Sequence, residues 1–229
     1  MFMSYKKSLA SPGRLRAARR GLWHTGMALI FGTLVLATTA GAARAAGTRQ
    51  YTAAAGGNLV ISGTSTFHNW TAKSTTLKGK AVFSGKWTGL GKAALKLQSI
   101  NLVIAVKSIK SSEGGGMDDT MYSALDIKHH ALITYKLTKA HLLARPTSAT
   151  AAAVFSTTGT LRVDGVTKTV PLVLTATPTP GGGLSITTKL KLKMTTFGVK
   201  PPTAMFGVIR SGNAITVTAT WPLAVKAGA

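Results

Sequence analysis

Apolar and polar residues alternate with a period of two along most of the chain after residue 57. The clearest stretch is 95–109, in which Ile100, Leu102, Ile104 and Val106 fall on one face of an extended backbone. Alternation of this kind predicts half-buried β-strands. Antiparallel strands in this number fit a closed barrel or a sandwich. We expect eight of them, over residues 58–68, 74–84, 95–109, 131–142, 152–163, 166–176, 184–194 and 214–223.

The most specific local signal is a two-residue turn, Asp164-Gly165, between two β-favouring runs. Asp-Gly tolerates the positive φ angles that a type I′ turn requires at both positions, so the pair predicts a tight hairpin. The pairing then starts with Val163 opposite Val166. Pro171 has no N–H to donate, and we expect its side of the strand to face a sheet edge or a bulge.

One stretch, residues 114–128, departs from the β pattern. After three glycines, Met117, Met121 and Leu125 recur at helical spacing, and Asp118 lies in the first turn, where a carboxylate complements the helix dipole. We predict a short helix that caps one end of the β structure. The methionines fit two interpretations, packing in an ordinary core or lining a site for a long apolar ligand.

The N-terminus has the layout of a signal peptide. The first 26 residues contain six basic residues and no acid, and the apolar run 27–40 is shorter than the roughly 20 residues of a transmembrane helix. Residues 43–45, Ala-Arg-Ala, fit a cleavage site. We predict a signal peptide over residues 1–45, a domain over residues 46–229, and a periplasmic or secreted location. The Sec route is favoured; twin-arginine export, through the arginines at 19–20, and an uncleaved anchor are the alternatives.

The amino-acid composition limits the kinds of site and partner that the protein can have. The sequence contains no cysteine, so disulfides and thiolate sites are excluded and the core alone must hold the fold. There are 28 Lys and Arg against five Asp and Glu; after residue 45 the numbers are 21 and five, a net charge of +16. Because the lysines occur singly, without interleaved aromatic residues, they indicate a solvated basic face, and no nucleic acid is expected as a partner. An anionic membrane surface is the alternative partner.

Enzymatic chemistry finds little support in the sequence. It contains no Gly-x-Ser-x-Gly motif and no Gly-Lys-Ser/Thr phosphate loop, and five carboxylates are few for paired acid and base roles. His129 and His130 would point to opposite faces of a strand, so with Asp126 and His141 they are not expected to bind a metal. We therefore predict a binding protein without a cofactor rather than an enzyme.

Four segments, taken in order, carry a family resemblance. They are ISGTSTFHNWTAKS (61–74), VKSIKSSEGGGMDDTMYSAL (106–125), TGTLRVDGVTKTVPLVL (158–174) and MTTFGVKPPTAMFGVIRSGNAITVTATWPL (194–223). Together they resemble the YceI-like, or polyisoprenoid-binding, family over residues 51–225. The resemblance implies an all-β fold, an eight-stranded antiparallel lipocalin-like barrel with a short capping helix, in the periplasm. It also implies that the barrel interior takes an isoprenoid lipid, such as a quinone or a polyprenyl phosphate.

Such an interior would be lined by large apolar side chains. Lys128, His129, Lys200 and Arg210 are candidates to meet a phosphate or quinone head group at its mouth. Two functions stay open: a carrier or scavenger of an isoprenoid lipid, and an envelope stress or interaction protein with a packed interior that docks on anionic membrane or polymer. Homodimer formation also stays open. The candidates for ligand contact are Phe67, Trp70, Ile104, Met121, Tyr122, Leu125, Ile133, Tyr135, Phe155, Met194, Phe197, Met205 and Phe206.

Overall fold

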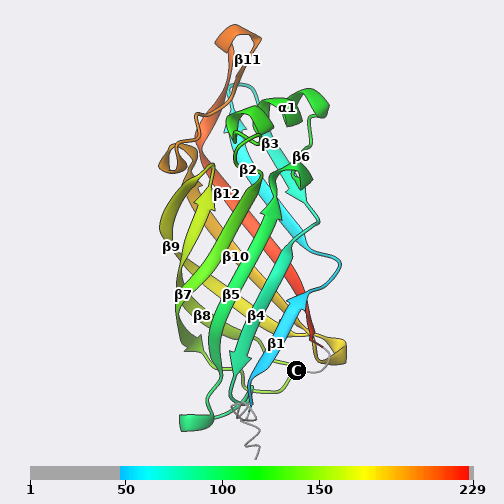
Figure 1. Cartoon of the computed structure of the whole chain (residues 1–229), viewed down its shortest axis with the longest axis vertical. Helices are drawn as coiled ribbons and strands as arrows, with labels where there is room; N and C mark the ends of the chain where they lie inside the picture. Colours follow the sequence, from blue (N-terminus) through cyan, green and yellow to red (C-terminus); the bar gives the residue numbers. More distant parts are fainter. Residues whose placement is uncertain (1–46, 227–229) are drawn as a thin grey trace, which may run out of the picture. The chain divides into compact units, whose positions relative to one another are not determined.

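The computed structural model of the protein describes residues 47–226, except for the side chains of Ala204 and Met205. The predicted signal peptide lies outside these residues. The described region consists mainly of β-strands, with one α-helix and short 3₁₀ turns (Figure 1). None of its helices is long and apolar enough to cross a membrane.

The α-helix, α1 (Gly115–Ala124), lies between the strands β6 and β7. The strands are β1 (Arg49–Ala53), β2 (Asn58–Ser65), β3 (Asn69–Ser74), β4 (Lys78–Ser84), β5 (Lys96–Ala105), β6 (Lys110–Ser111), β7 (Leu132–Ala144), β8 (Ala153–Val163), β9 (Val166–Pro178), β10 (Leu184–Lys193), β11 (Thr203–Ala204) and β12 (Ile209–Val225).

Eight of these strands close an antiparallel barrel (Figure 1). Their order around the ring is β1-β4-β5-β7-β8-β9-β10-β12, and β12 pairs back onto β1, with Tyr51 opposite Val225. Closing the ring pairs the edges that a flat sheet would leave free. The predicted all-β fold, with eight antiparallel barrel strands and one short helix, is confirmed.

The first three predicted strands, 58–68, 74–84 and 95–109, differ from the observed ones. β2 ends at Ser65, a separate strand β3 precedes β4, and the 3₁₀ turn η2 (Val106–Ser108) separates β5 from β6. β2 continues β1, β4 continues β3, and β6 continues β5. β2 pairs with β12, β3 with β2 and β6 with β3, so these segments extend the wall toward α1. No strand was predicted before residue 58, but Arg49–Ala53 forms the strand that closes the barrel. The small residues around Tyr51 hide the alternation there.

The hairpin of β8 and β9 has the predicted register. Val163 pairs with Val166, and the turn residues Asp164 and Gly165 have φ angles of 49° and 73°. β9 pairs with β10 only from Leu174 onward, whereas Pro171 lies in the part of β9 that pairs with β8 alone. The expectation that this proline faces a free edge is therefore confirmed.

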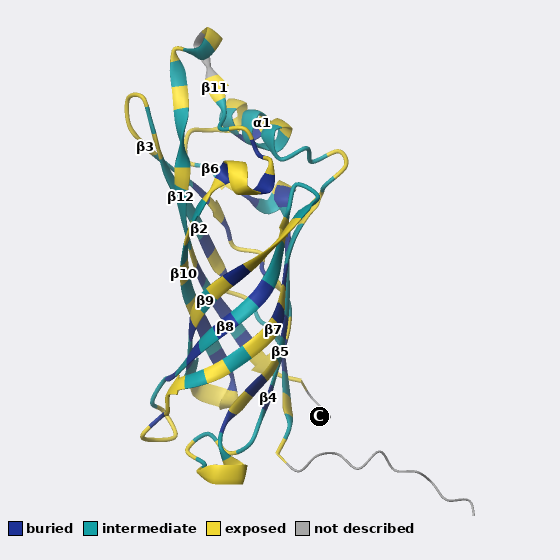
Figure 2. Ribbon diagram, turned by 90° about the vertical axis from the view of Figure 1, so that its left-hand side faces the viewer, coloured by how far each residue is buried: buried dark blue, intermediate teal, exposed yellow. Residues whose placement is uncertain are grey.

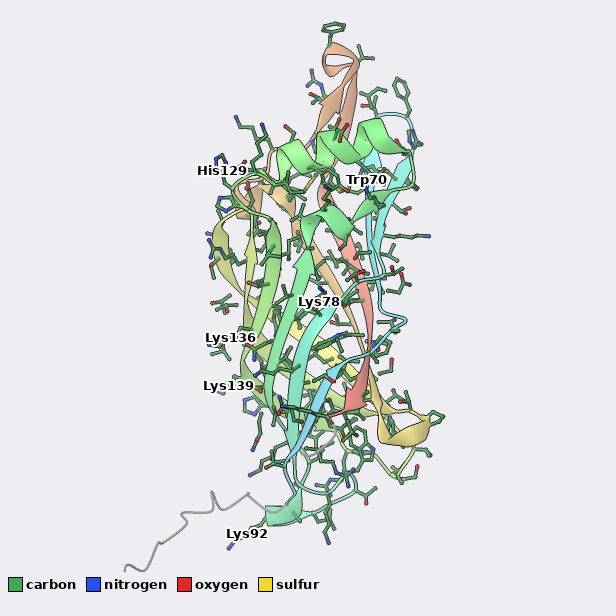
Figure 3. All side chains as sticks on the ribbon, turned by 45° about the vertical axis from the view of Figure 1, so that its right-hand side comes forward. Trp70, Lys78, Lys92, His129, Lys136 and Lys139 are labelled. Carbon is green, nitrogen blue, oxygen red and sulfur yellow. The ribbon has the colours of Figure 1, made fainter. Side chains whose placement is uncertain are left out.

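An aromatic cluster fills the barrel at the end opposite α1. The ring of Phe83 lies 5.8 Å from Tyr51, 6.0 Å from Phe155 and 6.4 Å from Trp87, centroid to centroid. Figure 3 places Lys92, in the loop beside this cluster, at one end, and Trp70 and His129 at the other. Figure 2 shows buried and exposed positions alternating along the strands. We call the four rings the aromatic cluster.

Candidate ligand-binding site

The capping helix α1 lies over the other end of the barrel, where two side chains anchor it. The Tyr122 hydroxyl donates to the carbonyl oxygens of Ile109 at 2.8 Å and Lys107 at 3.1 Å. The Asp118 carboxylate accepts the backbone N–H of Ser111 at 2.6 Å, and its other oxygen lies 3.0 Å from Lys110 Nζ. These bonds join α1 to the segment that leads into it.

The same contacts shift two pKa values. The Ser111 amide, followed by the Lys110 ammonium, holds the pKa of the Asp118 carboxyl below its ordinary value. Tyr122, followed by Asp118, raises the pKa of Lys110. Both shifts favour the ionised forms of Asp118 and Lys110, and the attraction between the two charges is a secondary cause of each.

Beneath α1 the barrel contains a cavity of about 220 Å³. Met117, Met121 and Ala124 of α1, with Leu125 just after it, lie on the cavity side because residues three and four apart share one face of a helix. The rest of the lining comes from β2, β3, β5 to β10 and β12 and from the segment 194–202. The residues of the aromatic cluster do not line it, so the cavity occupies the α1 end and the aromatic cluster packs the other end.

Eight of the thirteen candidate residues line this cavity. What they share is an inward position, either on a barrel strand or on the capping segments at its α1 end. Contact with a ligand itself stays a prediction for all of them. They are Trp70, Ile104, Met121, Leu125, Ile133, Tyr135, Met194 and Phe197.

Four candidates lie elsewhere, each for a physical reason. Phe155 is 1% exposed and packs in the aromatic cluster at the other end. Tyr122 is on α1 but uses its hydroxyl to anchor the helix. Phe67 is 66% exposed in the β2–β3 turn, and Phe206 is fully exposed between β11 and β12. The side chain of Met205 is outside the described part.

The sequence reasoning missed much of the aliphatic lining because it favoured aromatic residues and methionine. The signal was present in β10, where Leu190 and Leu192 line the cavity and alternate with the exposed residues Lys189, Lys191 and Lys193. In a closed barrel the face opposite a row of lysines must point inward. In β12 the lining residues Ile215, Val217, Ala219 and Trp221 alternate with threonines in the same way.

The lining is almost wholly apolar, and none of the charged side chains in residues 47–226 takes part in it. Trp70 Nε1 already donates to Thr64 O and Ser211 Oγ, both at 3.0 Å. Burial raises the pKa of Tyr135, which keeps the phenol neutral. Trp221 Nε1 is buried and has no hydrogen-bond partner within the described part of the chain. Such a surface suits an apolar ligand and offers no acid and base pair for catalysis.

The four head-group candidates are exposed and outside the cavity lining. Lys128 and His129 belong to the turn after α1, where His129 Nδ1 lies 2.8 Å from both carboxylate oxygens of Asp126. Lys200 precedes β11, and Arg210 donates from Nε to Gly207 O at 2.9 Å. All four lie on segments of the α1 end, but they do not converge on one point of the cavity mouth.

The fold and the cavity together define a closed, capped antiparallel β-barrel with a neutral apolar interior. The model of the YceI-like domain family matches residues 50–222, and the chain belongs to this family. No curated protein matches it significantly.

Solved structures show the same fold at low identity. A polyisoprenoid-binding domain from Saccharophagus degradans, implicated in plant cell wall breakdown, is 14% identical, with a TM-score of 0.57 over 77% of this chain and 98% of that one. BcnA from Burkholderia cenocepacia is 16% identical, with a TM-score of 0.53 over 72% and 95%. The Campylobacter jejuni YceI protein is 15% identical, with a TM-score of 0.50 over 68% and 84%.

Proposed function

We propose that the protein binds an isoprenoid lipid, a quinone or a polyprenyl phosphate, in the cavity beneath α1 and carries or sequesters it in the periplasm. The observation that carries the proposal is the continuous apolar lining, which has no charged member and is closed by a helix. Family membership and the polyisoprenoid-binding S. degradans domain support the ligand class. The signal-peptide layout of the N-terminus supports export.

The affinity would come from the tail rather than from the head group. Each buried methylene-sized group gains about 0.8 kcal/mol, so a five-carbon unit gains on the order of 4 kcal/mol before the costs of ordering it. No charged group of the lining competes with this term. We therefore expect a head group without its tail to bind far more weakly than the intact lipid.

Exchange of such a lipid requires a bilayer, and the α1 end offers a surface for one. Phe67 and Phe206 are exposed on two turns that hydrogen bonds join: Thr66 N–H donates to Arg210 O, and Arg210 N–H donates to Thr66 Oγ1, both at 3.0 Å. Aromatic side chains beside a cation suit the interface of an anionic bilayer. We propose that this pair of turns contacts the membrane.

The direct test is native mass spectrometry, with organic extraction, of the mature protein purified from its own periplasm. One polyprenyl species at near-stoichiometric level is the expected result. A protein that is empty on purification and does not take up added quinones or polyprenyl phosphates would contradict the proposal. It would favour the interaction protein, whose basic exterior would then bind anionic polymer with a steep salt dependence.

A matched pair of variants sharpens the test. Ala124 lines the cavity at the end of α1, whereas Ala93 is exposed in the 3₁₀ turn η1 (Gly91–Ala93), between β4 and β5. Ala124→Trp places an indole in the ligand's space and should reduce bound lipid severalfold, while Ala93→Trp adds the same group outside and should not. Equal lipid content in the two variants, both folded by circular dichroism, would refute the assignment of the cavity.

A further inference from the structure

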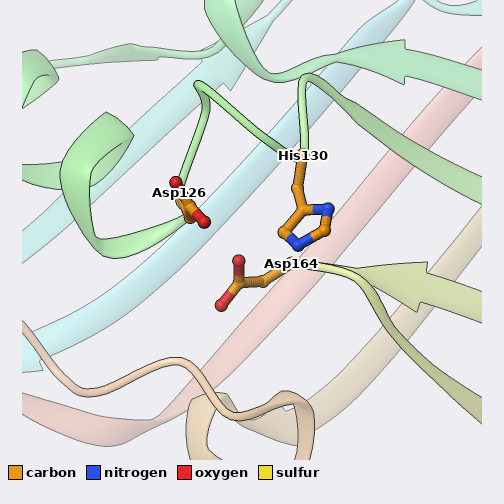
Figure 4. A group of neighbouring side chains, drawn as sticks. All are labelled: Asp126, His130 and Asp164. Carbon is orange, nitrogen blue, oxygen red and sulfur yellow. The ribbon is translucent and has the colours of Figure 1, made fainter.

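The turn after α1 and the β8–β9 turn carry a group of side chains that the proposed function does not use. Asp126, His130 and Asp164 each direct one ligand atom, a carboxylate oxygen or a ring nitrogen, into a common space, and these atoms lie within 4.8 Å of one another (Figure 4). We call these three residues the rim cluster. From their chemistry and convergence we propose that the rim cluster binds a divalent transition-metal ion.

The fold brings the rim cluster together from two separate loops. Asp126 follows α1 with a φ of 42°, and the N–H of His130 donates to its carbonyl oxygen at 2.8 Å. Asp164 comes from the β8–β9 turn. The ring of His130 packs on that turn so closely that a Cβ at Gly165 would lie 2.6 Å from Nε2. The imidazole of His130 therefore lies directly against the backbone of the turn that carries Asp164.

This arrangement escaped the sequence reasoning because it placed the two histidines on a strand. They lie instead in the turn before β7, and His130 comes close to Asp164 (Figure 4). His141, the third histidine considered there, pairs with Ser156 well along β7 and is not part of the cluster. No local sequence signal connects Asp164, a turn residue, with the histidines.

The charge pattern supports a cation at this position. The chain has only five acids against 28 Lys and Arg, yet two of the acids face each other here. Across residues 47–226, neither Asp126 nor Asp164 forms an ion pair with a lysine or an arginine. Nearby carboxylates repel unless a cation lies between them. His129 also holds both oxygens of Asp126 at 2.8 Å, as outer partners of ligating carboxylates do.

The ligand set selects the class of metal. One imidazole nitrogen and two carboxylate oxygens suit Zn²⁺, Co²⁺, Ni²⁺ or Mn²⁺, whereas Ca²⁺ and Mg²⁺ prefer oxygen alone. Bonds of about 2.0–2.2 Å in a tetrahedral arrangement would bring the ligand atoms to about 3.3–3.6 Å from one another, so the loops must close around the ion from a present spread of up to 4.8 Å. Three protein ligands leave positions for water or for an anion.

A metal at the rim cluster would join the turn after α1 to the wall of the barrel. The neighbours of its ligands in the chain, Leu125 and Val163, line the cavity. We infer that metal binding restrains the capping segment and slows ligand exchange. This second step rests on the proposed function, whereas metal binding itself does not.

Metal binding is tested with the mature protein, Zn²⁺ in calorimetry and Co²⁺ in visible absorption. We expect one ion per chain, and at least tenfold weaker binding in Asp164→Asn and His130→Gln. Asn tolerates the positive φ of residue 164, so the turn should survive. The controls Asp119→Asn and His141→Gln remove the same kinds of group from exposed positions and should bind as the parent does.

Two results would overturn the site. One is the absence of saturable binding below about 1 mM, which is the weak end of specific affinities. The other is equal binding by the rim variants and the controls. The restraint has its own readout, the rate of lipid transfer to acceptor vesicles with and without Zn²⁺. A rate that Zn²⁺ does not change in the parent protein would refute the restraint. Since the metal titration uses no lipid, failure of the lipid proposal would leave its result interpretable.

Discussion

One end of the barrel is packed and the other holds a cavity, and this division predicts different effects for two truncations of large side chains. Phe155 is 1% exposed, and its ring lies 6.0 Å from Phe83 in the aromatic cluster. Met121 lines the cavity from α1. Truncation of Phe155 leaves a closed void, whereas truncation of Met121 enlarges a space that is already open.

The magnitudes follow from this difference. A Phe→Ala change in a packed core costs about 3–5 kcal/mol, through lost transfer free energy and the new void, and the edge contact with Phe83 adds to it. In a domain of this size about 1 kcal/mol shifts Tm by roughly 2–4 °C, so we expect a fall of roughly 6–20 °C for Phe155→Ala. Met121→Ala creates no new closed void, so its cost should fall below the about 2–5 kcal/mol of a Met→Ala change in a packed core.

The assay is urea unfolding of the delipidated mature protein, followed by far-UV circular dichroism, with lipid binding measured on the same samples. Phe155→Ala should lose free energy of unfolding and keep its lipid stoichiometry, while Met121→Ala should keep most of its stability and bind lipid more weakly. The reasoning is refuted if Phe155→Ala costs less than about 1 kcal/mol, or if Met121→Ala destabilises the protein equally.

Two further predictions concern the α1 end. Phe206→Ser should weaken sedimentation with anionic vesicles severalfold, whereas Leu90→Ser, a 67% exposed position at the other end, should not; equal effects would contradict the proposed contact. Folding lowers the pKa of Asp118 from its ordinary 3.8, so its stabilisation is present above that pH and is lost as the pH falls through the lower folded value. We therefore expect α1 to stay anchored down to about pH 4 in a circular dichroism titration of the parent protein. The variant Asp118→Asn should have a lower free energy of unfolding than the parent at neutral pH. A variant as stable as the parent would refute the anchoring role of Asp118.

The sequence predicted the strands well where one face is apolar and the other polar. The Asp164-Gly165 turn fixed a register, and the alternation around Ile104 identified an inward face. It failed at β1, where small residues such as Ala53 give no contrast between faces. The interruption after β1 includes Gly56, whose φ of 86° breaks the extended backbone in a way that composition does not reveal.

The site was only partly predictable because hydrophobicity does not distinguish the interior of a barrel from the tip of a turn. Phe206 and Phe197 are the same residue type in one loop region, yet one is fully exposed and the other is buried against the cavity. The sequence also could not show which distant residues come together in the fold. Asp164 and His130 meet only because the barrel brings the β8–β9 turn beside the segment before β7.

The aromatic cluster has a consequence for how a ligand reaches the cavity. Since Phe83 and its neighbours pack the far end, a ligand of the cavity would have to enter at the α1 end. There β10 pairs with β9 only as far as Thr188, and the 3₁₀ turn η4 (Met194–Phe197), which lines the cavity, contacts β9. The capping helix, the rim cluster and the turn that carries the exposed Phe206 lie at this same end (Figure 1). Under the proposed function, membrane contact, entry of the lipid and restraint by a metal would therefore all occur at one end of the barrel.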